Sequence, residues 1–65
     1  MNTNIEVTSD TFFKLFENVK PTSFNKKETH EITIYHNDKI QQRGVKIYNF
    51  ASSQTSQYYL TDINA

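Results

Sequence analysis

The residues of this chain best suited to chemistry are two histidines, His30 and His36, six positions apart. Polar and apolar residues alternate around them, which predicts a β-strand. On a strand the two rings stand roughly 20 Å apart, too far to bind one metal ion. Glu28 or Glu31 could pair with His30, but two side chains do not make a site. We therefore expect both histidines to face solvent, with no metal and no cofactor.

Other routes to catalysis are equally poorly supported. The chain has one glycine, so it can hardly build a glycine-rich phosphate loop. Serine, histidine and aspartate are present, but their placement suggests no nucleophile and base. It has no cysteine, which excludes a disulfide and a zinc site built on thiolates. A chain of 65 residues also leaves little room for a cleft that excludes water. We expect a protein that is not an enzyme.

The charges are balanced, with seven basic and seven acidic side chains. A general nucleic-acid binder would have an excess of basic residues, and a protein that mimics DNA would have an excess of acidic residues. The balanced charge argues against both classes. Asn, Lys, Ile, Tyr and Thr are frequent, a composition typical of AT-rich genomes such as those of low-GC bacteria, their phages and plasmids. No apolar run has the length of a membrane span and no leader-like segment opens the chain, so a cytoplasmic protein is expected.

The segment 10–20 carries the pattern of an amphipathic helix. Phe12, Leu15, Phe16 and Val19 follow the i, i+3, i+4, i+7 spacing of one helix face. Good N-cap residues precede the segment and Pro21 follows it, since the residue before a proline disfavours the helical region. Residues 22–27 are expected to be a connector. Before the helix, residues 1–7 could be a short edge strand or a disordered lead-in.

Three segments, about 29–36, 44–51 and 57–63, have the period of two that predicts strands. Between the first two, a tight turn at Asn37-Asp38 would pair Tyr35 with Ile40, and a longer tip over 37–43 is the other interpretation. Between the last two, a loop at 52–56 would pair Tyr48 with Leu60. The same register pairs Phe50 with Tyr58, Lys46 with Asp62, Ile47 with Thr61 and Val45 with Ile63.

These elements predict a single small α+β domain, in which the helix packs on a three-stranded antiparallel β-meander. This fold could include an extra edge strand from the N-terminal residues. The alternative is a small SH3-like half-barrel, in which strong bending of the strands buries both faces of the sheet.

A short helix can cover only one face of this sheet. We expect it to cover the β-branched face, which holds Val45, Ile47, Ile63, Ile32 and Ile34. The opposite assignment, with the aromatic face as core, stays open. An uncovered apolar patch suggests association. The predicted partner-binding residues are Tyr48, Phe50, Tyr58 and Leu60, with Tyr35 and Arg43 beside them.

The hypothesis that follows is a non-catalytic protein-binding module from a bacterium, phage or other mobile element. It would inhibit or adapt a larger protein by stoichiometric docking, or associate with itself as a homodimer. The alternative is a small nucleic-acid-binding protein that stacks bases on the sheet tyrosines and contacts phosphates through Lys39, Arg43 and Lys46. A third interpretation is that the tyrosines are ordinary strand residues without a partner.

Overall fold

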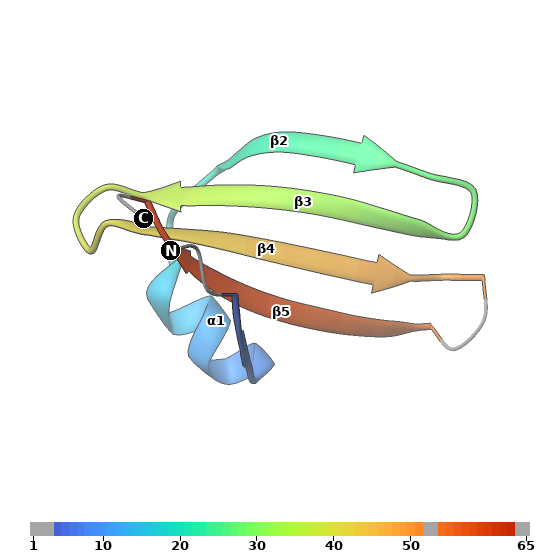
Figure 1. Ribbon diagram of the computed structural model, residues 1–65, viewed down its shortest axis with the longest axis horizontal. Coiled ribbons are helices and arrows are strands. Elements are labelled where there is room, and N and C mark those ends of the chain that lie inside the picture. Colours follow the sequence, from blue (N-terminus) through green and yellow to red (C-terminus); the bar gives the residue numbers. More distant parts are fainter. Residues whose placement is uncertain (1–3, 52–53, 64–65) are drawn as a thin grey trace.

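The computed structural model describes residues 4–51 and 54–63. Within these residues, one short helix accompanies a five-stranded antiparallel sheet with the strand order β1-β5-β4-β3-β2 (Figure 1). The small α+β class is confirmed, and the expectation of three strands is wrong. The elements are β1 (Ile5–Val7), α1 (Ser9–Leu15), β2 (Pro21–Lys26), β3 (His30–Asn37), β4 (Gln42–Asn49) and β5 (Thr55–Asp62).

Helix α1 has seven residues and is shorter than the predicted 10–20. Thr8 is its N-cap, because the Thr8 hydroxyl accepts a hydrogen bond from the Thr11 backbone N–H (3.3 Å). Phe16 is the C-cap, and its N–H still donates to the Phe12 carbonyl (3.1 Å). Asn18 then adopts a φ of 64°, a left-handed conformation that asparagine tolerates and that turns the chain away. The helix therefore ends before Pro21 can terminate it.

Two edge strands complete the sheet. β1 pairs with β5 and is the extra N-terminal strand that the sequence left open. β2 pairs with β3 in the segment expected to be a connector, which corrects that expectation. All six residues of β2 are exposed, so backbone pairing rather than burial of a face holds it in place. Pro21 fits at the start of an edge strand, where its missing N–H removes no central pairing.

The β4–β5 register differs from the expected one. Tyr48 pairs with Ser56 instead of Leu60, and Lys46 pairs with Tyr58 instead of Asp62. The Ile63 N–H donates to the Gln41 carbonyl (3.0 Å) in place of a pairing with Val45. Because the partner moves by an even number of residues, every side chain keeps its predicted face.

The β3–β4 hairpin has a turn length between the two alternatives. Asn37 pairs with Gln42, so residues 38–41 form the turn. The Asn37 side-chain oxygen accepts a hydrogen bond from the Lys39 N–H (3.0 Å), and Gln41 adopts a φ of 55°. These contacts fit the preference of asparagine for turns.

The helix packs on the aromatic face of the sheet, which corrects the favoured assignment of the core. Phe12 is fully buried and Phe16 is 6% exposed. The Phe12 ring lies 5.6 Å from that of Tyr35 and 5.0 Å from that of Tyr58, centroid to centroid. Between these two strands Gly44 leaves room for the phenylalanines, since a Cβ on Gly44 would lie 2.6 Å from the Phe16 ring. The core is therefore a cluster of rings above a glycine.

Candidate interaction surfaces

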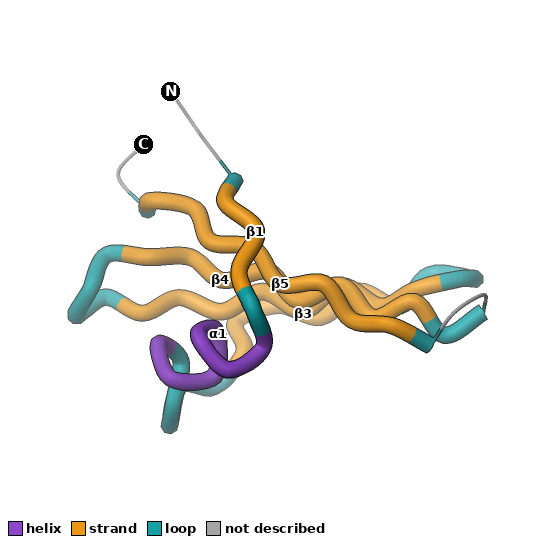
Figure 2. The backbone as a smooth tube through the Cα atoms, turned by 90° about the horizontal axis from the view of Figure 1, so that it is seen from below, coloured by secondary structure: helices purple, strands orange, loops and turns teal. Residues whose placement is uncertain are grey.

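The helix covers only one end of the sheet. An eight-residue strand is about 26 Å long, whereas seven helical residues span about 10 Å. Figure 2 shows α1 beneath one end of the strands and no helix beneath the other end, within the described part of the chain. Towards the loops that follow β2 and β4, the described residues form a single layer with both faces open. Such a layer buries little apolar surface by itself.

The uncovered part of the aromatic face holds a group of side chains that we call the aromatic end, comprising Phe24, Lys26, Tyr48 and Phe50. The rings of Tyr48 and Phe50 lie 6.3 Å apart, and the Lys26 ammonium stands 5.7 Å from the Phe50 centroid. Phe24, which pairs with Thr33 on the neighbouring strand, is 58% exposed. The aromatic end therefore offers flat rings and one cation to solvent.

The predicted partner-binding residues divide between three places. Tyr48 and Phe50 lie together at the aromatic end. Tyr35 and Tyr58 contact the Phe12 ring, and Leu60 is the cross-strand neighbour of Gly44 on the same covered part of the sheet. Arg43 lies on the opposite face. A contact patch made of all six residues therefore stays a prediction, and the structure brings only Tyr48 and Phe50 together in the open.

The opposite side of the sheet carries the residues first expected to form the core. We call this surface the aliphatic face, and it consists of Ile32, Ile34, Val45, Ile47 and Tyr59. Ile32 pairs with Ile47, Ile34 with Val45, and Val45 with Tyr59, so the five side chains are contiguous across three strands. All five are partly exposed. Val45, Ile47 and Tyr59, with Asn4, line a hollow of about 230 Å³ on this face.

Polar residues surround the aliphatic face. At one end, the Nε–H of Arg43 donates to Nε2 of His36 (3.1 Å), which makes the two a cross-strand pair. Next to Arg43, Thr61 is 6% exposed and its hydroxyl donates to the Asn4 side-chain oxygen. At the other end, His30 pairs with Asn49. Both histidines are thus partly buried and hydrogen-bonded, His30 to the Thr29 hydroxyl and His36 to Arg43, which differs from the exposed state expected of them.

The three cations of the nucleic-acid hypothesis occupy three different surfaces. Lys39 lies in the turn 38–41, Arg43 on the aliphatic face, and Lys46 on the helix side with its ammonium 6.0 Å from the Phe13 centroid. A groove that tracks a phosphate backbone needs its cations on one surface. The hypothesis stays a prediction, and this arrangement does not strengthen it.

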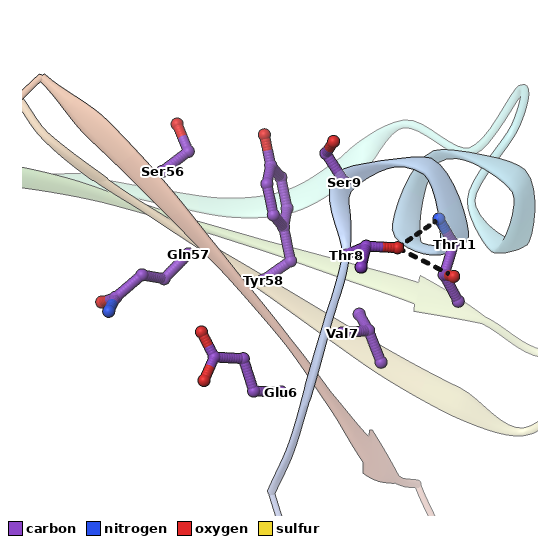
Figure 3. A pocket seen from close by; sticks show the side chains of 8 residues that line it. All are labelled: Glu6, Val7, Thr8, Ser9, Thr11, Ser56, Gln57 and Tyr58. Atoms are coloured by element: carbon purple, nitrogen blue, oxygen red, sulfur yellow. Dashed lines mark hydrogen bonds between the residues drawn. The ribbon is translucent and has the colours of Figure 1, made fainter.

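A polar groove runs beside the start of the helix, where β1 ends and β5 continues (Figure 3). Its lining residues are Glu6, Val7, Thr8, Ser9, Thr11, Ser56, Gln57 and Tyr58. Figure 3 shows the Ser9, Ser56 and Tyr58 hydroxyls on one side of the strands and the Glu6 carboxylate on the other. These groups do not converge on a common point, so the groove assembles no nucleophile with its base.

The described residues contain no cluster of three or more His, Cys, Asp or Glu side chains that could hold a metal ion. Among the same residues, no helix has the length and apolar character needed to cross a membrane. The chain matches no family model, no curated protein and no solved structure.

Sequence reasoning missed part of both surfaces. Phe24 was placed in a connector, because its neighbours in β2 are polar and show no alternation. The aliphatic face was assigned to the core, because β-branched residues fit a covered sheet. A usable signal was present in Gly44. It shares the face of Lys46 and Tyr48, and a lone glycine in a strand marks a close approach of another segment.

Proposed function

We propose that this chain is a non-catalytic protein-binding module that docks through the aromatic end and acts as a stoichiometric inhibitor or adaptor of a larger protein. The observation that carries the proposal is the ring pair of Tyr48 and Phe50, whose centroids lie 6.3 Å apart at the end of the sheet that the helix does not cover. Phe24, which is 58% exposed on the edge strand β2, lies on the same face of the sheet two residues before Lys26.

The chemistry of the aromatic end fits a protein partner. Tyrosine and phenylalanine provide a large contact area and lose little conformational entropy on binding, since each has two side-chain torsions. Lys26 above the Phe50 ring supplies a cation that an acidic group of the partner can pair with at the rim. Hot spots of binding energy typically combine such aromatic residues with a surrounding polar ring.

The test is affinity capture from a lysate of the source cells, followed by titration of each purified binder with the native chain and with Tyr48→Ala. We expect one-to-one binding that Tyr48→Ala weakens by about 10–100-fold, a hot-spot effect. Phe13→Ala is the matched control, because Phe13 is also an exposed aromatic residue (51%) but lies on the helix. Equal binding by the native chain and Tyr48→Ala would rule out the aromatic end as the docking surface.

The same titration separates protein binding from the nucleic-acid alternative. Binding of single-stranded DNA through phosphate contacts weakens steeply as salt rises, whereas apolar docking changes little. Titrating the chain with an oligonucleotide at low and high salt therefore decides between the two. A strong, salt-dependent affinity for the oligonucleotide would replace the proposal by the alternative.

A further inference from the structure

We infer that the aliphatic face is the interface of a homodimer in which two sheets pack face to face. This inference does not depend on the proposed function, because the aliphatic face and the aromatic end lie on opposite sides of the sheet. A second copy seated on the aliphatic face would leave the aromatic end of each chain open to a partner.

The composition of the aliphatic face has the anatomy of an interface. Its centre is formed by uncharged apolar side chains on three neighbouring strands. Its margin is polar, with Arg43 and His36 at one end and His30 and Asn49 at the other. On the edge strand β1, Glu6 lies beside Tyr59 and adds an acidic group to this margin. An apolar centre with a polar rim is the arrangement found in specific protein interfaces, where charged residues avoid the centre.

The size of the face agrees with what a small dimer needs. From the lengths of the five strands and their spacing, the sheet projects onto about 500 Å². The accessible area of such a face is larger than its projection, because side chains make it rough. A specific interface buries about 800 Å² on each partner, so the dimer would have to use nearly the whole face. Face-to-face packing of one sheet on another is the geometry that achieves this.

The position of Arg43 favours one relation between the two copies. With a two-fold axis along the strands, Arg43 at the end of the central strand β4 would meet Arg43 of the second copy. With the axis in the plane of the sheet but across the strands, Arg43 meets Asn49 instead. This second arrangement also brings Val45 onto Ile47 and Ile32 onto Ile34, so that the apolar residues of β3 and β4 face one another. On β5 it brings Tyr59 onto Gln57. The β3 and β4 part of the face is therefore complementary to itself, as a two-fold interface requires.

Sedimentation equilibrium tests the inference on the native chain over about 1–300 µM, a range that detects micromolar association. We expect a mass twice the 7.7 kDa of one chain. Ile47→Lys places a charge beside the two-fold axis and should raise the dissociation constant by at least about 100-fold, as expected for an unpaired charge at an interface centre. Ser56→Lys is the matched control, since it adds the same charge to the helix side of the sheet. It should remain dimeric.

A native chain that stays monomeric throughout this range would overturn the inference, and so would a dimer that persists in folded Ile47→Lys. If Ile47→Lys does not fold, nuclear Overhauser effects in a mixture of labelled and unlabelled native chain replace it. We expect contacts between Val45 methyl groups of one copy and Ile47 methyl groups of the other. A dimer without these contacts uses another surface and would contradict the inference. None of these outcomes depends on whether a larger protein binds the aromatic end.

Discussion

Replacing Gly44 by alanine tests the packing that holds the helix on the sheet. The added Cβ would lie 2.6 Å from two atoms of the Phe16 ring and 2.7 Å from the Phe12 ring, below the 3.4 Å at which ordinary van der Waals contact begins. The rings have little freedom to retreat, because Tyr35 and Tyr58 flank Phe12 at centroid distances of 5.6 and 5.0 Å. The substitution must therefore push the helix away from the sheet.

The expected loss can be worked out from two opposing effects. Overpacking of a core by one methyl group costs about 1–3 kcal/mol. Replacing glycine also restricts the unfolded chain, which returns about 0.4–1 kcal/mol. The net decrease in the free energy of unfolding is therefore about 1–2 kcal/mol, and each kcal/mol lowers the melting temperature of a domain this size by about 4–8 °C.

Urea denaturation followed by far-ultraviolet circular dichroism measures this loss, at one fixed protein concentration so that association does not contribute. The double variant Gly44→Ala with Phe16→Leu is the matched control, because a smaller side chain at position 16 gives the methyl group room. We expect the two changes together to destabilise less than the sum of the single effects, by about 0.5 kcal/mol or more. A Gly44→Ala protein at least as stable as the native chain would refute the reasoning.

Two further changes probe the same end of the molecule. Phe12→Ala removes the fully buried ring and should cost about 3–5 kcal/mol, enough to unfold a domain with so small a core; circular dichroism at 25 °C checks this. Asn37→Ala removes the hydrogen bond from the Asn37 amide to the Leu15 carbonyl (2.6 Å) at the end of the helix, together with the bond that the Asn37 side-chain oxygen accepts from the Lys39 N–H (3.0 Å). Urea denaturation should show a loss of about 1–2 kcal/mol. An unchanged midpoint for Asn37→Ala would mean that the helix end is held without the bond to the Leu15 carbonyl.

The helix shows how far a periodic pattern can be trusted. The spacing of Phe12 and Phe16 correctly predicted the face that the helix buries. Val19 continues the same spacing but lies beyond the helix, since Asn18 has already turned the chain. A side-chain period reports which residues share a face, whereas the end of a helix depends on backbone conformations that the period does not record.

The strands show the same limit in another form. Alternation assigned the residues of β4 and β5 to the correct faces but to the wrong partners. Matching apolar with apolar residues favoured Tyr48 opposite Leu60, and a displacement by an even number of residues keeps all faces while changing every pair. β2 could not be found by pattern at all, because a fully exposed edge strand has no buried face to produce one.

The choice of the covered face could have been made from the sequence. Both faces are apolar, so hydrophobicity alone does not distinguish them. Gly44, however, lies on the aromatic face in either register, and its missing side chain is what lets Phe12 and Phe16 approach the backbone. The contact patch was predicted on the aromatic face because the helix was expected to leave that face uncovered. Only the far end of the face, where Tyr48 and Phe50 lie beyond the helix, is uncovered.

Because the helix covers only one end of the sheet, the position of a residue along its strand decides whether its side chain belongs to the core or lies open. Within β4, Gly44 makes room for the two phenylalanines of the core. Tyr48, four residues further on, has its ring contact with Phe50 and not with a ring of the helix. A chain built in this way can exchange side chains near the loops after β2 and β4 while its buried core stays the same. New recognition properties can thus arise on a framework that does not have to be redesigned.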